Sequence, residues 1–119
     1  MGKYVVKQAK SGFMFNLKAG NGEIIATSEV YSSEDACRAG IESVKKAAAA
    51  ANLEDQTVEG FAEQKHPKFE VYNDKAGQFR FRLKAVNGQI VVTGEAYTSK
   101  SGCMGGIDSI KRNIDSPVE

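Results

Sequence analysis

The sequence has few of the residues that build covalent or metal frameworks. It contains two cysteines and one histidine in 119 residues. Two cysteines are too few for a disulfide framework, and together with one histidine they supply a four-ligand zinc site poorly. We therefore expect no metal and no other cofactor. Hydrophobic residues make up 41% of the chain, which is enough for a packed core in a chain the size of one ordinary domain.

The sequence also lacks long apolar runs and an excess of charge of either sign. No run approaches the roughly 20 apolar residues that cross a bilayer, and the N-terminus has no apolar signal-peptide core. The formal net charge is +1, which argues against a polyanion as the main partner. These absences predict a cytoplasmic protein of a prokaryotic type with no membrane partner.

What the chain does contain is one motif in two copies. Residues 79–113 align with residues 13–47 at a constant offset of 66, with 17 identities in 35 positions. Such a match indicates a tandem duplication. In the first copy the identical residues are Phe13, Phe15, Leu17, Lys18, Ala19, Asn21, Gly22, Ile24, Thr27, Glu29, Tyr31, Ser33, Cys37, Gly40, Ile41, Ser43 and Lys45.

Each copy begins with a pattern typical of a three-stranded antiparallel meander. Apolar and polar residues alternate over residues 13–19, as in a half-buried strand. Asn21-Gly22 follows, and it predicts a hairpin with a type I′ turn, in which both central residues have positive φ. The strands expected on this basis are residues 4–6, 13–19 and 23–27 in the first copy, and 69–72, 79–85 and 89–93 in the second.

A helix is expected after each meander. Ser33 and Ser99 stand at the start of these helices, where a serine can cap the first turn. Gly40 and Gly106 fall inside the helices, where glycine costs up to about 1 kcal/mol relative to alanine. Its presence in both copies suggests that each helix closely approaches another backbone. The apolar stripes are Cys37, Ile41, Val44 and Ala48 in the first helix, and Cys103, Ile107, Ile110 and Ile114 in the second.

The duplication has a physical reason. One repeat of about 60 residues would be marginally stable alone and would leave an open sheet edge. We therefore expect an α+β fold with one domain, residues 1–119, made of two intertwined βββα(β) repeats (about 1–61 and 62–119). The repeats would share a single largely antiparallel sheet around a pseudo-twofold axis, with both helices packed on one face. Such a chain is expected to be a monomer that acts as an internal pseudo-dimer.

The repeated motif resembles the YegP-like family, whose members are small, mostly bacterial proteins of unknown function. The resemblance rests on Phe-x-Phe-x-Leu-Lys-Ala-x-Asn-Gly-x-Ile, then Tyr-x-Ser, then Gly-Ile-x-Ser-Val/Ile-Lys. It implies three strands, a helix and a further strand in each repeat, with the two C-terminal strands exchanged between repeats. The candidates for those strands are residues 57–61 and 114–118. The family has no agreed activity, so the resemblance transfers no site residues.

One strand carries a basic stripe. Arg80, Arg82 and Lys84 alternate with apolar residues, so they share one face of the expected strand. They could bind phosphate groups, or they could form ion pairs with neighbouring strands on a solvated face. The first copy has Met14 and Asn16 in place of the two arginines, so the stripe is not duplicated.

Two other pairs of residues allow both a functional and a structural interpretation. Cys37 and Cys103 could be reactive thiols near a helix N-terminus, or small buried hydrophobes on the helix stripes. Glu29 and Glu95 could form a paired-carboxylate site near the pseudo-twofold axis, or support the turn into each helix. His66 is the only histidine and is expected on a surface loop.

Three classes of function are consistent with these residues. A small non-enzymatic module with an unknown partner, possibly a protein, would bind through the open sheet face or a sheet edge. The alternative is nucleic-acid or nucleotide binding through Arg80, Arg82 and Lys84, with an affinity that falls steeply with salt. A thiol-redox protein or other small enzyme is the third class, although no catalytic residue can be assigned.

Overall fold

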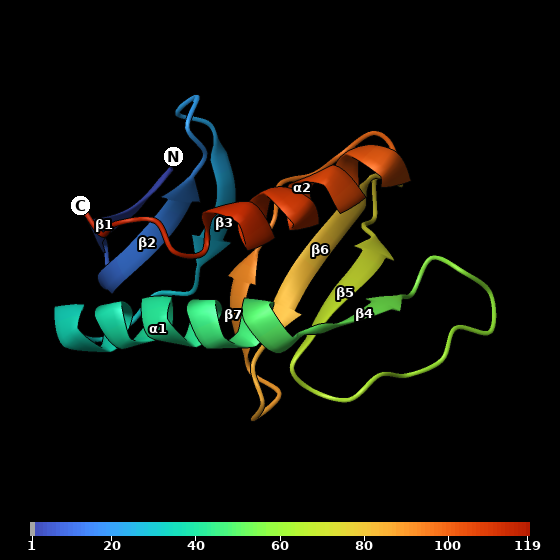
Figure 1. Cartoon of the computed structure of the whole chain (residues 1–119), viewed down its shortest axis with the longest axis horizontal. Helices are drawn as coiled ribbons and strands as arrows, with labels where there is room; N and C mark the ends of the chain where they lie inside the picture. Colours follow the sequence, from blue (N-terminus) through green and yellow to red (C-terminus); the bar gives the residue numbers. More distant parts are fainter. Residues whose placement is uncertain (1) are drawn as a thin grey trace.

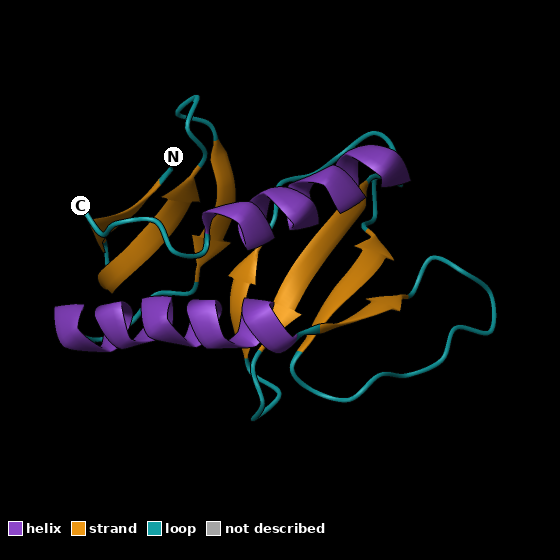
Figure 2. Cartoon of the chain, in the orientation of Figure 1, coloured by secondary structure: helices purple, strands orange, loops and turns teal. Residues whose placement is uncertain are grey.

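The computed structural model describes residues 2–119, which form one sheet with two helices on the same face (Figure 1). Groups of strands alternate with single helices along the chain (Figure 2). The elements in chain order are β1 (Lys3–Ala9), β2 (Gly12–Lys18), β3 (Ile24–Ser28), α1 (Glu34–Ala50), β4 (Asn52–Asp55), β5 (Lys68–Asn73), β6 (Phe79–Lys84), β7 (Ile90–Thr93) and α2 (Lys100–Asn113).

The seven strands in residues 2–119 lie in the order β1-β2-β3-β7-β6-β5-β4. Neighbouring strands are antiparallel except β4 and β5, which are parallel. β3 and β7 join the two halves of the sheet through only two residue pairs, Thr27 with Thr93 and Ser28 with Val92. The predicted α+β class and mostly antiparallel sheet are confirmed.

The hairpins lie where the sequence places them, but the predicted turn type is wrong. Within residues 2–119 only glycines have positive φ, so Asn21 does not adopt the conformation that a type I′ turn requires. Instead, Ala19 N–H donates to the Glu23 carbonyl, and Gly22 has a φ of 87° in a three-residue loop. The Asn21 side-chain oxygen accepts a hydrogen bond from Glu23 N–H, which explains why asparagine is favoured there.

Both helices begin as expected, with the hydroxyls of Ser33 and Ser99 accepting hydrogen bonds from the N–H groups of Ala36 and Gly102. The seven stripe residues that lie within α1 and α2 are buried, and Ile114 follows α2 as a half-buried residue.

The helix glycines have a different reason from the one expected. A Cβ atom built on Gly40 would lie 2.4 Å from the hydroxyl oxygen of Tyr31, and one on Gly106 would lie 2.3 Å from that of Tyr97. The close approach is therefore to a tyrosine ring and not to another backbone.

The C-terminal segments of the two repeats are exchanged, although their positions differ from those expected. β4 pairs with β5 of the second repeat, and Tyr4 of β1 pairs with residues 117–119. Residues 57–61 are not a strand, because Asp55 accepts hydrogen bonds from both the N–H and the hydroxyl of Thr57 and turns the chain away from the sheet. The strand predicted at 114–118 is reduced to a single bridge at Val118.

The core lies between the sheet and the helices. Each repeat contributes a row of three aromatic rings, with neighbouring ring centroids 6.0 to 6.4 Å apart. The rows are Tyr4, Phe15 and Tyr31, and Phe69, Phe81 and Tyr97. No helix in residues 2–119 is long and apolar enough to span a membrane.

Candidate functional site

The basic stripe on β6 faces carboxylates. Arg82 Nε donates to Glu70, and the Lys84 ammonium lies 3.2 Å from the same carboxylate. Arg80 lies 3.9 Å from Asp74 at the end of the β5–β6 hairpin. All three cations are therefore engaged in ion pairs across the strands.

Glu70 belongs to a buried ion network between β4, β5 and β6. Glu54, Lys68 and Glu70 are each at most 4% exposed, and the Lys68 ammonium lies 2.8 Å from Glu54 and 3.2 Å from Glu70. Burial alone would raise the pKa of Glu54. Hydrogen bonds from Lys68, Gln56 and the Gln64 N–H outweigh that effect and hold the pKa at about 2. Because its charges are satisfied within the fold, this network has a structural role.

The two thiols are buried among core side chains, each with 0% exposure. Burial raises the pKa of both, to about 11 for Cys103, where Asp55 adds to the effect. A reactive thiol needs a lowered pKa, so the geometry opposes the thiol-redox hypothesis. His66 lies exposed on the loop between β4 and β5. No cluster of three or more His, Cys, Asp or Glu side chains in residues 2–119 could hold a metal ion.

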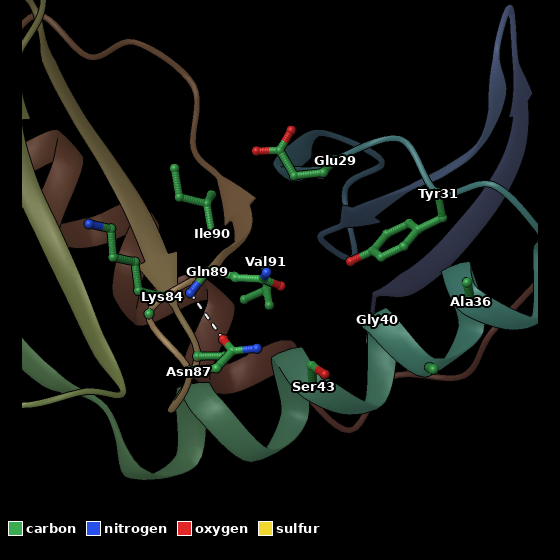
Figure 3. A pocket seen from close by; sticks show the side chains of 13 residues that line it. Glu29, Tyr31, Ala36, Gly40, Ser43, Lys84, Asn87, Gln89, Ile90 and Val91 are labelled. Atoms are coloured by element: carbon green, nitrogen blue, oxygen red, sulfur yellow. Dashed lines mark hydrogen bonds between the residues drawn. The ribbon is translucent and has the colours of Figure 1, made fainter.

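A hollow lies between α1 and the hairpin that joins β6 to β7. Its volume is about 720 Å³, and we call it the junction pocket because both repeats line it (Figure 3). Ser43 and Gly40 come from α1, Tyr31 from the segment before it, and Asn87 and Ile90 from the hairpin of the second repeat. Figure 3 shows Tyr31 reaching toward α1 from one side and Asn87 facing it from the other.

The polar groups of the junction pocket are largely free. The Tyr31 hydroxyl, the Ser43 hydroxyl and the Gln89 side-chain amide form no hydrogen bond within residues 2–119, and the Asn87 side-chain NH₂ is also uncommitted. The other side-chain atom of Asn87, its oxygen, accepts from Gln89 N–H at 3.0 Å (Figure 3). The Glu29 carboxylate makes no ion pair among these residues. The pocket therefore offers donors, acceptors and one negative charge to a ligand.

The Tyr31 hydroxyl is half-buried, and burial is the main influence on the pKa of this phenol. Burial raises this pKa, and the nearby Cys37 and Glu29 add to the effect. Lys84 also lines the pocket, but Figure 3 shows its side chain pointing away from Asn87 and Tyr31, and its ammonium is paired with Glu70. Among the described residues that line the pocket, only Glu29 and Lys84 carry a formal charge, and Lys84 is paired with Glu70.

The sequence contained a signal for this site in residues that recur in both copies of the motif. Glu29, Tyr31, Ser43 and Asn87 are identical in both copies. The sequence predicts a turn support at Glu29 and a hairpin residue at Asn87, and it assigns no separate role to Tyr31 or Ser43. It could not show that the glutamate and tyrosine of one repeat face the asparagine of the other. Glu29 and Glu95 each lie close to the tyrosine two residues later, whose pKa they raise.

The fold and the repeated motif define the class: an α+β protein with a seven-stranded, mostly antiparallel sheet and two helices. A family model described as a domain of unknown function (DUF1508) matches the chain in two segments, residues 9–55 and 74–118. The chain belongs to this family. The predicted resemblance to YegP-like proteins is thereby confirmed, and the family has no known function.

Several relatives span most of the chain. A UPF0339 protein of Pseudomonas aeruginosa is 41% identical over 111 residues, which is 92% of this chain and 87% of the relative. The solution structure of yegP from E. coli, described as a protein of unknown function, has a TM-score of 0.79 and 32% identity, covering 99% of this chain and 90% of that one.

Another relative is as short as one repeat. A UPF0339 protein of Treponema denticola is 59% identical over 46 residues, which cover 39% of this chain and 79% of the relative. A match to two segments of this chain and a relative of single-repeat length both agree with a duplicated unit.

Proposed function

We propose that this protein is a small non-enzymatic binding module whose ligand occupies the junction pocket. The observation that carries the proposal is the convergence of uncommitted polar groups from both repeats on one hollow. Tyr31 and Ser43 approach it from the first repeat, and Asn87 and Gln89 from the second. These groups are half-buried or exposed and, apart from the Asn87 side-chain oxygen, have no hydrogen-bond partner within residues 2–119, so they are available to a ligand.

We also infer that the chain is one domain of two intertwined repeats (about 1–61 and 62–119) related by a pseudo-twofold axis. Thr27 and Thr93 are equivalent positions of the repeat, and they pair with each other in the centre of the sheet. The exchanged C-terminal segments support the same arrangement. The chain would thus be a monomer. Its two repeats would form within one chain the same interface that two single-repeat chains would form in a dimer.

Nucleic-acid binding through Arg80, Arg82 and Lys84 is the weaker alternative. A phosphate group would have to compete with Glu70, which is 3% exposed and accepts from both Arg82 and Lys84. Drawing those cations away would leave the buried Glu70 carboxylate with Lys68 as its remaining ion-pair partner, which is costly. Nucleic-acid binding through these residues would predict an affinity that falls steeply as the salt concentration rises.

The proposal can be tested by blocking the pocket. Ala39 is exposed and lines the pocket, so Ala39→Trp would fill it without disturbing the core. Ala49 is also exposed on α1 but lies outside the pocket, so Ala49→Trp is the matched control. A library of small polar compounds and short peptides would be screened by amide chemical shifts.

We expect binders to shift the amides of Tyr31, Ser43 and residues 87–91. Ala39→Trp should weaken them at least tenfold, while Ala49→Trp should leave their affinity unchanged. Binders that map to the open face of β5 and β6 and are indifferent to Ala39→Trp would refute the proposed site.

A further inference from the structure

A second hollow continues the junction pocket along α1. It has a volume of about 410 Å³ and shares Ser43, Ala85 and Asn87 with the junction pocket. Beyond these shared residues it is lined by α1 residues up to Ala50 and by Val86 at the tip of the β6–β7 hairpin. We call the two hollows together the α1 groove.

The length of the α1 groove suits a short extended chain. Its α1 residues run from Ala36 to Ala50, a distance of about 21 Å at roughly 1.5 Å per residue. An extended peptide rises about 3.3 Å per residue, so about six residues would span the groove. At the pocket end the groove is also lined by Ile90 and Val91, which have no partner in β3 because that pairing stops at Val92.

The two ends of the groove differ in chemistry. One end is lined by Tyr31 and by Glu29, whose carboxylate makes no ion pair within residues 2–119. The other end has Ala47, Ala50 and Val86, and Val86 is 77% exposed. This end of the groove therefore offers apolar side chains that an apolar residue of a ligand could cover, which would remove them from water.

The middle of the groove suits a main chain. The Asn87 NH₂, the Gln89 amide and the Ser43 hydroxyl can pair with the amide groups of a peptide, which need partners once they leave water. Lys46 lies at the apolar end and disfavours a second cation there. The negative charge of Glu29 at one end and the positive charge of Lys46 at the other therefore favour one direction for the bound peptide.

We propose that the α1 groove binds an extended peptide segment of about six residues from a partner protein. A lysine or arginine of the peptide meets Glu29, and an apolar side chain covers Val86. This inference rests on the proposed function and adds the class of ligand, its length and its direction.

The second repeat does not build the same groove. Gly20 stands where the first groove has Val86, and Asn113 stands where it has Ala47. α2 ends at Asn113, so the counterpart of Ala50 lies beyond the helix. The apolar end is missing there, and the expected stoichiometry is one peptide per chain.

A random peptide library displayed on phage would be panned against the intact protein. We expect enriched sequences to share a lysine or arginine and an apolar residue three to five positions away. One enriched peptide would then be synthesised, labelled and titrated by fluorescence anisotropy.

Matched variants test each end of the groove. Glu29→Gln should weaken the peptide about two- to fivefold, the size typical of an exposed ion pair. It should have no effect on a peptide whose basic residue is replaced by glutamine. Val86→Ser should weaken binding by a similar factor. The controls Glu95→Gln, at the equivalent position of the second repeat, and Val30→Ser, at another exposed valine, should leave binding unchanged.

The possible failures separate the two proposals. Two results would show that the proposed peptide class is wrong while the junction pocket stands. In the first, no peptide is enriched. In the second, the enriched peptides lack a basic residue but still lose binding in Ala39→Trp. If enriched peptides bind Ala39→Trp as well as wild type, both this inference and the proposed binding site are wrong.

Discussion

Tyr31 and Gly40 show how one contact links a repeat's turn to its helix. The tyrosine ring stacks on Phe15 at a centroid distance of 6.4 Å, and its hydroxyl lies against the Cα of Gly40. A side chain at position 40 would have to displace a ring that is held from the other side. The glycine therefore serves to seat the tyrosine that lines the junction pocket, and Gly106 does the same for Tyr97.

This contact predicts that Gly40→Ala is destabilising although alanine favours helix. The added methyl group would overlap the Tyr31 ring, and overpacking of this kind costs about 1–3 kcal/mol. Gly105→Ala is the control, because a Cβ there meets nothing within 4 Å, and it should gain up to about 1 kcal/mol from helix propensity. Urea unfolding of both variants measures the difference. Equal stabilities for the two variants would contradict the role given to Tyr31.

β4 is stabilised by residues that lie far from it in the sequence. Its four residues include Glu54, whose carboxylate is 2% exposed and joins β4 to Lys68 on β5. Hydrogen bonds from the Gln56 side chain and the Gln64 N–H tie the following loop to the same carboxylate. This short strand is therefore stabilised by the ion network as well as by its backbone hydrogen bonds with β5.

The network predicts a specific acid sensitivity. The pKa of Glu54 is lowered from 4.5 to about 2 in the fold, so its contribution to stability is fully present above about pH 4.5 and is lost as the pH falls toward 2. Glu54→Gln should cost about 3 kcal/mol at neutral pH and should show a smaller further loss between pH 5 and 3 than wild type.

Urea unfolding at several pH values would measure this effect. The control is Glu63→Gln on the exposed part of the loop, expected to change stability by less than about 0.5 kcal/mol. A Glu54→Gln variant with the wild-type pH profile would show that another carboxylate dominates.

For the whole molecule, the exchanged segments mean that neither repeat contains its own complete sheet. β4 pairs with β5 and the C-terminal residues pair with β1, so each half supplies an edge to the other. A unit of about 60 residues also buries too little surface to be comfortably stable alone. The two halves should therefore depend on each other for folding.

Cleaving the chain between the repeats tests this dependence. Fragments 1–61 and 62–119 are each expected to be largely unfolded, and mixing them should restore the secondary structure in a one-to-one complex. Circular dichroism and sedimentation of the separate and mixed fragments would measure it. A fragment that folds as a monomer, with no gain on mixing, would argue against intertwined repeats.

The sequence by itself determined the elements and their class. Alternation over residues 13–19, the asparagine-glycine hairpins and the capped helix stripes are local signals, and local signals depend on neighbours along the chain. The exchange of C-terminal segments was expected only through the family resemblance, and its strand was placed at 57–61 when it lies at Asn52–Asp55. The turn from Asp55 to Thr57 is local and ends the strand, but which segment pairs with β5 depends on the packing of the two repeats.

Only the tertiary structure decided the candidate site. It brought Glu29 and Tyr31 of one repeat opposite Asn87 and Gln89 of the other, and it engaged the basic stripe with Glu70. The first of these contacts joins residues far apart in the chain and depends on how the two repeats meet, at the β3–β7 pairing and through α1. The second depends on the register of β5 against β6. Residue type and spacing specify what each side chain can do, whereas the packing of the two repeats specifies which side chains act together.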